Sequence, residues 1–551
     1  MEKDNLKDNL KKELSEVKDF LSDWSQRKIR ERKIGETLFD EEFRIEDMPL
    51  SLFYRPILYS NLLPPPFVTV DDFLSGKKKN RLKIKLSRAL FQKYLAQIDN
   101  MKSFCTKKKM VPSKKEKIFF LTFTTMSFRE QKIIEMINND GKYEVFRLGV
   151  DPLTAFSPAK IRRMEHTLYG YYDQEIRMKA RTDSKELARK WNRINDIIKA
   201  TMLQNKGKDL YSYYKENLNF LYSQQFIFLV SKYYYTFCKI LQEENINGIV
   251  VGSQNNIIEK CLIAAAWKRN LPVFIIQHGI GLGTYPTIDT PKNVKFAVFS
   301  EKYKNELMGL GIPAENIQIT GPIIFDGIEE FIDENKKSGK EKNRKNILVA
   351  TSPFVEDRFM EKEEYFRKVK KILQDLAHIN QAVTITIKLH PREKYKEEYE
   401  KIVREMGINV IISTVVDRQK HYLLIRECDV LLSFGSTVAL EAMIIGRPTL
   451  TIELFDEVNP TNDSVRDQTA TTIVSWTEDI GKATRSLLSS NNAAKGKKLI
   501  EKLCYKIDGK SSERIVEYLY ETIEKNYKTD ENYKTDENYK IDENNQNRTN
   551  S

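Results

Sequence analysis

The chain has 551 residues, which is too long for one ordinary hydrophobic core and predicts two or three domains. Hydrophobic residues make up 40% and charged residues 31%, a balance that excludes a largely disordered protein and favours a soluble globular one. No apolar run reaches the ~18 residues that cross a bilayer, and no signal peptide is evident, so we expect a cytoplasmic protein. The net charge of +13 calls for an anionic partner, which could be nucleic acid, a membrane surface or a phosphorylated substrate.

Cofactor chemistry finds little support in the sequence. The five cysteines are widely spaced, odd in number and without a C-x-x-C pair, so neither a disulfide framework nor a zinc site is indicated. There is also no D-x-D cluster, no Walker loop and no G-x-S-x-G elbow. We therefore predict no metal and no cofactor.

The two ends of the chain differ from its centre. Residues 1–110 are predicted to form a helical, basic extension, because apolar residues from Leu6 to Trp24 recur at helical spacing and runs of lysine follow. Docking on the body or on a partner is favoured over a membrane anchor, since the polar face mixes both charges. Residues 526–551 repeat a polar motif and are predicted to be a disordered tail.

The centre is predicted to be α/β, with two doubly wound parallel-sheet, Rossmann-like domains that face a cleft. The first spans 111–335 with a helical, aromatic-rich insertion, the second spans 346–490, and helices fill 491–525. Parallel sheets bind ligands outside the carboxyl ends of their strands, so the loops there should carry the chemistry. The expected strands are Ile118–Phe123, Gly248–Val251, Pro272–Ile276, Val294–Phe299, Ile317–Thr320, Ile347–Ala350, Val383–Leu389, Val410–Ile412, Val430–Ser433 and Thr449–Ile452.

Lys388-Leu389-His390-Pro391 lies where a strand of the second domain ends, because proline cannot continue the strand pairing. His390 is thereby placed at the carboxyl edge of the sheet. A histidine there can donate to a phosphate oxygen or give up a proton to a leaving group. A single such histidine is more often a structural hydrogen-bonding residue, so the motif needs support from others.

Ser433-Phe434-Gly435-Ser436-Thr437 follows another strand and precedes a helix. Gly435 allows a tight turn, the helix start favours an anion, and the hydroxyls of Ser436 and Thr437 add donors. A simple helix cap is the structural alternative. Glu441, one turn along the helix, is placed to reach the ribose of a nucleotide bound there.

A second histidine, His278, ends a strand of the first domain in Gln277-His278-Gly279 and is followed by further glycines. These glycines do not match the dinucleotide fingerprint, which excludes a nicotinamide cofactor. Ser253 follows the strand Gly248–Val251. We assign Gln277, Gly279 and Ser253 to the loops that line the cleft on the acceptor side.

Taken together, these motifs, with Glu441-Ala442 and Gly446-Arg447-Pro448, resemble the two-domain (GT-B type) glycosyltransferase superfamily. It includes capsule polysaccharide synthesis proteins, polyglycerolphosphate (teichoic acid) polymerases and bacterial sialyltransferases. The resemblance covers roughly Gly248 to Ile452 and implies that His390, Ser436 and Thr437 hold the donor phosphate, with Lys388 beside them, and that His278 is the base. The Asp-Gly motif of sialyltransferases is not evident, and Arg392-Glu393 replaces the second histidine typical of the polyglycerolphosphate polymerases.

The leading hypothesis is a metal-independent glycosyltransferase that moves a sugar from a nucleotide donor to a surface-glycan or lipid-linked acceptor. A CDP-glycerol-type glycerophosphotransferase and a UDP-sugar 2-epimerase on the same fold are the enzymatic alternatives. A basic protein that binds nucleic acid or membrane is the non-enzymatic one, but the lysine runs lack interleaved aromatics and no nucleic-acid motif accompanies them. Peripheral contact with an anionic membrane is compatible with the enzyme hypothesis.

Overall fold

The computed structural model describes residues 28–31, 35–54, 115–122, 130–149, 166–202, 204–205, 208–252, 254, 257–277, 279, 293–332, 344–357, 359–379, 382–455, 470–489 and 495–526. Two of the predicted site residues, Ser253 and His278, lie outside these ranges. So do the predicted amino-terminal helix and nearly all of the predicted tail. Within the described ranges, no helix is long and apolar enough to span a membrane.

The first domain is built on a seven-stranded sheet with the order β13-β12-β11-β10-β5-β6-β7, in which every pairing is parallel. From β5 the chain adds β6 and β7 on one side and then β10 to β13 on the other, which is the order of a doubly wound Rossmann sheet. Four-residue and longer strands are buried on both faces, as parallel sheets require. The strands are β5 (Lys117–Thr122), β6 (Glu144–Gly149), β7 (His166–Thr167), β10 (Ile246–Val251), β11 (Val273–Ile276), β12 (Val294–Val298) and β13 (Ile317–Ile319).

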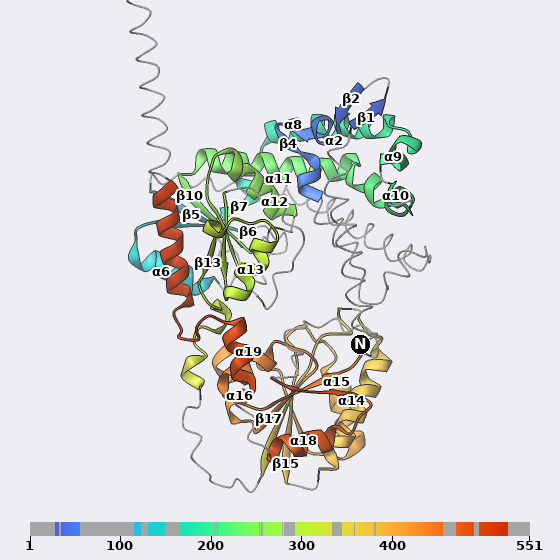
Figure 1. Ribbon diagram of the computed structural model, residues 1–551, viewed down its shortest axis with the longest axis vertical. Coiled ribbons are helices and arrows are strands. Elements are labelled where there is room, and N and C mark those ends of the chain that lie inside the picture. Colours follow the sequence, from blue (N-terminus) through green and yellow to red (C-terminus); the bar gives the residue numbers. More distant parts are fainter. Residues whose placement is uncertain are drawn as a thin grey trace, which may run out of the picture.

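A layer of helices extends this domain on the side away from the second sheet (Figure 1). The insertion predicted to be helical forms α8 (Gln174–Arg193), α9 (Asp196–Met202), α10 (Leu210–Leu221) and α11 (Gln224–Glu243). Its aromatic residues are core, since Trp191 stacks on Tyr222 at 4.1 Å and both are buried. α12 (Ile257–Lys268) packs against α11.

The described part of the amino-terminal segment contains strands as well as short helices. β1 (Lys28–Glu31) pairs with β2 (Gly35–Leu38), and α2 (Phe39–Glu42) leads into the short strands β3 (Arg44–Ile45) and β4 (Met48–Pro49). Phe43 and Tyr54 pack edge-on against Tyr222. This segment therefore belongs to the core of the helical layer.

The second domain has a six-stranded parallel sheet with the order β16-β15-β14-β17-β18-β19, again the Rossmann order. One hydrophobic core joins this sheet to α14 (Lys362–Ala377), α15 (Lys396–Met406) and α18 (Ile480–Ser489). A second core, which also includes residues of the first domain, contains α16 (Arg418–Glu427), α17 (Val438–Ile445) and α19 (Lys495–Leu503). Its strands are β14 (Lys345–Ala350), β15 (Val383–Lys388), β16 (Val410–Ser413), β17 (Val430–Ser433), β18 (Thr449–Glu453) and β19 (Thr472–Ser475).

The chain finally returns to the first domain. A helix of residues 511–526 packs Ile515, Leu519 and Ile523 against strands and α6 (Gln131–Asp140) of the first sheet. The carboxylate of Asp326 accepts hydrogen bonds from the amides of Ser511 and Ser512 and so caps the start of this helix. Figure 1 shows the helix beside β5 and β10, with the two sheets at opposite ends of the molecule.

The predicted fold class, two Rossmann-like domains, is confirmed. β6, β7 and β19 were not foreseen, because none of them shows a long apolar run in the sequence. The return of the last helix was not foreseen either, since an amphipathic pattern does not reveal which domain a helix covers.

Candidate functional site

The predicted donor residues meet at one place, the carboxyl edge of the second sheet. β14 is the strand at which the order of this sheet reverses, and it pairs with β15 on one side and β17 on the other. The loops that follow these three strands carry Thr351, His390 and Ser436. This reversal point is where doubly wound sheets bind their ligands.

His390 is held as a neutral hydrogen-bond donor. The backbone amide of Arg392 donates to its Nδ1 at 3.2 Å, so the neutral ring carries its proton on Nε2. Burial, together with the charges of Arg392 and Lys388, lowers the pKa of His390 from 6.5 to about 4. His390 can therefore donate to an anion at neutral pH, but it carries little positive charge of its own.

Glu393 fixes the loop that bears His390. Its partly buried carboxylate accepts hydrogen bonds from the amide of His390 at 2.6 Å, the hydroxyl of Tyr399 at 2.7 Å and the hydroxyl of Thr351. Burial raises its pKa against the lowering effect of these donors. In the sequence, Glu393 stands out only as a departure from a family motif, although Pro391 places it at the same edge of the sheet.

Arg392 connects two of the three loops. Its guanidinium makes a bidentate ion pair with Asp357 in the loop after β14, with Nη1–Oδ1 and Nη2–Oδ2 distances of 2.5 and 2.9 Å. Such planar pairs fix orientation as well as charge. The loops after β14 and β15 therefore hold each other in place.

Lys388, the last residue of β15, is a buried cation without a direct partner. The residue is 7% exposed, and its ammonium makes no hydrogen bond or ion pair with any residue that the structure describes. Desolvation lowers its pKa, and the more distant carboxylates of Glu441 and Glu393 only partly offset this. A buried cation is costly unless something compensates its charge, and an anionic ligand would do so.

The turn after β17 supplies further donors. Gly435 has φ +85°, in the left-handed region that glycine adopts without strain. The amide of Ser436 donates to the hydroxyl of Ser433 at 2.9 Å, and Thr437 caps α17 without a side-chain hydrogen bond to the helix. The Thr437 hydroxyl and the positive end of an eight-residue helix thus follow β17 at the same edge of the sheet as Lys388 and His390, with β14 between them.

Glu441 has a partner that the sequence analysis did not foresee. Its Oε2 lies 2.6 Å from Nε2 of His421 on α16, and both side chains are largely buried. The predicted contact with a ribose therefore requires the carboxylate to use its second oxygen or to leave His421. Identifying His421 from sequence would have needed the packing of α16 on α17.

On the first sheet, Gln277 has a structural role. Its side chain accepts from the amide of Phe299 at 2.9 Å and donates to the carbonyl of Gly279 at 2.9 Å. Gln277 thereby joins the ends of β11 and β12 and fixes the backbone on both sides of position 278. Within the described part of the chain, no cluster of His, Cys, Asp or Glu could hold a metal ion.

A family model for UDP-N-acetylglucosamine 2-epimerase matches residues 288–520. No curated protein sequence matches the chain significantly. Among solved structures, the chain is similar to UDP-GlcNAc 2-epimerase from Neisseria meningitidis bound to UDP-GlcNAc, with 13% identity, a TM-score of 0.46 and coverage of 74% of this chain and 100% of that one.

The chain is also similar to UDP-GlcNAc 2-epimerase from Methanocaldococcus jannaschii, with 15% identity, a TM-score of 0.44 and coverage of 74% of this chain and 99% of that one. Another similar structure is MurG of Acinetobacter baumannii, with 13% identity, a TM-score of 0.40 and coverage of 74% and 99%. The family match supports the epimerase alternative better than the leading glycosyltransferase hypothesis. No finding singles out capsule synthesis proteins, teichoic acid polymerases or sialyltransferases.

Proposed function

We propose that the protein is an enzyme that acts on a nucleotide-activated sugar, and that the carboxyl edge of the second sheet holds the diphosphate. The observation that carries this proposal is the convergence of Lys388, the Nε2–H of His390 and the start of α17 around the reversal point of the sheet. A desolvated ammonium without a carboxylate partner, a neutral donor and a helix end together suit a phosphate group.

Epimerisation at C2 of a UDP-N-acetylhexosamine is the reaction that the family match favours. The C2 proton of such a sugar has no adjacent carbonyl to acidify it. Without a redox cofactor, inversion can proceed if a base takes the C2 proton while the C1–O bond to UDP breaks, which leaves a C1=C2 double bond. UDP then adds back to C1 while a proton is delivered to the opposite face of C2. Lys388 and His390 would stabilise the UDP that departs and returns.

The test is to incubate the protein with UDP-GlcNAc alone in D₂O and to follow the sugar by proton NMR. An epimerase produces a second UDP-sugar and exchanges the C2 proton for deuterium. Lys388→Met is the control that should abolish both signals. If UDP binds but the sugar remains unchanged, epimerisation is wrong and the nucleotide site stands; if no nucleotide binds, the whole proposal fails.

Glycosyl transfer to a surface-glycan or lipid-linked acceptor is the second candidate. It is favoured by the contacts of Gln277 after β11, which fix the backbone on both sides of position 278, where the sequence predicts the catalytic base. In this reaction His278 takes the proton of the acceptor hydroxyl while the same phosphate-binding groups stabilise the leaving nucleotide. A glycerophosphotransferase would use the same arrangement with a CDP-linked donor.

The donor nucleotide separates these candidates further. A nucleotide that binds only the folded protein raises its melting temperature in proportion to the logarithm of its concentration. Thermal-shift measurements with UDP, CMP, CDP and GDP therefore rank the bases directly. Stabilisation by UDP agrees with the family match, whereas stabilisation by CDP alone would favour the glycerophosphotransferase.

A further inference from the structure

A row of five cations runs along α8, the outer helix of the helical layer. Arg177, Arg181, Lys185, Arg189 and Arg193 recur every four residues. A helix turn takes 3.6 residues, so successive members advance by about 40° and the row winds gradually across the side of α8 that faces away from the buried Ile176 and Leu187. Arg177 is half-buried, and the other four residues are exposed. We call these five residues the basic row.

The basic row is not neutralised by the protein itself. None of its five side chains makes an ion pair with any residue that the structure describes. The other lysines of α8 differ, because Lys179 pairs with Glu46 and Lys190 pairs with Glu42 and Glu186. Like charges four residues apart destabilise a helix, so the row costs stability unless an anionic partner binds it.

The surroundings of the row combine polar and apolar features. A hollow between α8 and the start of α11 is lined by Lys185, Arg189, Asn192, Asn219, Gln224 and Gln225. The amino end of α11, capped by Ser223, adds a positive helix end to it. Met178 on α8 is 55% exposed, and Ile197, just beyond the end of α8, is 77% exposed.

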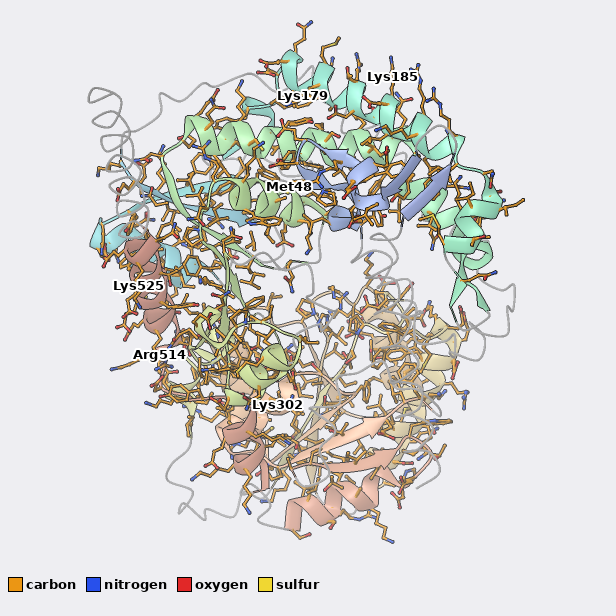
Figure 2. The ribbon with its side chains drawn as sticks, turned by 45° about the horizontal axis from the view of Figure 1, so that its top comes forward. Met48, Lys179, Lys185, Lys302, Arg514 and Lys525 are labelled. Atoms are coloured by element: carbon orange, nitrogen blue, oxygen red, sulfur yellow. The ribbon has the colours of Figure 1, made fainter. Side chains whose placement is uncertain are left out.

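We propose that the basic row docks the protein on an anionic lipid membrane, with phosphate headgroups in the hollow and Met178 and Ile197 at the headgroup boundary. Basic residues on one face of a helix, with apolar side chains beside them, are what an anionic bilayer attracts. No exposed aromatic residue lies on the row to stack on bases, which disfavours a nucleic acid. Figure 2 shows Lys179 and Lys185 at the outer edge of the helical layer, away from the second sheet.

The test is co-sedimentation of the full chain with vesicles of phosphatidylcholine alone or with about 30 mol % phosphatidylglycerol, at about 0.15 M salt. The variant Arg181→Gln, Lys185→Gln, Arg189→Gln removes the centre of the row while keeping good helix formers. Each basic residue near an anionic surface strengthens binding about fivefold, so the triple variant should bind on the order of 100-fold more weakly.

The matched control is Lys401→Gln, Lys482→Gln, Lys498→Gln, three exposed lysines of the second domain that change the net charge equally. The control should bind anionic vesicles like the wild type, and neither protein should bind phosphatidylcholine alone. Equal loss in both variants, or no binding by the wild type, overturns the proposal. Tighter binding to RNA than to vesicles, lost in the row variant, overturns it in favour of nucleic acid.

The outcome is independent of the proposed reaction. Binding of UDP in solution should be the same for the wild type and the row variant, because α8 lies on the first domain and Lys388 on the second. A row variant that loses UDP binding as well would show a general structural defect, which circular dichroism and the melting temperature would reveal. In that case Lys185→Gln alone, expected to bind vesicles about fivefold more weakly, decides the question.

Discussion

Replacing Lys388 by methionine tests whether this buried lysine serves a ligand or the fold. Methionine keeps the length and apolar stem of the side chain and removes only the ammonium. In the free protein the ammonium is desolvated and has no ion pair among the described residues, so its loss should leave the melting temperature unchanged or raise it.

Nucleotide binding should change in the opposite direction. A hydrogen bond to a charged phosphate contributes about 1.5 to 3 kcal/mol, which corresponds to a Kd for UDP roughly 10- to 150-fold weaker in Lys388→Met. Isothermal titration calorimetry gives the Kd, and differential scanning fluorimetry gives the melting temperature. Weaker binding together with undiminished stability identifies a residue that is retained for its ligand.

Lys295 provides the matched control. It is also a lysine whose pKa is lowered by burial, but it lies near the start of β12 in the first sheet and donates to Asn316. Lys295→Met should leave UDP binding unchanged. The reasoning is refuted if Lys388→Met binds UDP like the wild type, or if both variants weaken it equally.

Substitutions at three further residues probe the same edge of the sheet. His390→Ala should weaken UDP binding by about 1.5 to 3 kcal/mol in calorimetry. The pKa of His390 is about 4 in the folded protein and 6.5 ordinarily, so the unfolded state takes up a proton first as the pH falls. The wild type should therefore lose stability as the pH falls from about 6.5 to about 4. His390→Gln should lose less stability over this range, as measured by urea titrations at each pH. Glu393→Gln replaces a carboxylate that accepts four hydrogen bonds with an amide, so it should lower the melting temperature and weaken UDP binding through the loop of His390. A variant as stable as the wild type would exclude this role. Gly435→Ala forces alanine to φ +85°, so it should destabilise the protein by about 1 kcal/mol and weaken UDP binding. Gly407→Ala is the control, because Gly407 follows α15 at φ +60° with open space around it. This control should cost similar stability and leave UDP binding intact.

The sequence was sufficient to place several site residues because their positions depend on local backbone chemistry. Pro391 stops β15 and so puts His390 at the edge of the sheet, and Gly435 marks the turn that only a left-handed residue makes easily. Buried parallel strands also appear in the sequence as apolar runs, which is why the alternation of strands and helices in the two Rossmann-like domains could be predicted.

The remaining features depend on contacts between segments far apart in the chain. Neither the bond from Thr351 to Glu393 nor the pairing of His421 with Glu441 leaves a local pattern, because the partners come from different loops and helices. The helix of residues 511–526 looks like any amphipathic helix, and only packing decides that it covers the first sheet. The short strand β7 pairs over two residues and has no run to detect.

The most direct test of the central claim is a crystal structure of the protein with UDP. We expect the diphosphate over the reversal point of the second sheet, with its oxygens within hydrogen-bonding distance of Lys388 Nζ, His390 Nε2 and the Thr437 hydroxyl. A nucleotide bound at the first sheet, or phosphates away from all three of these groups, would contradict the account.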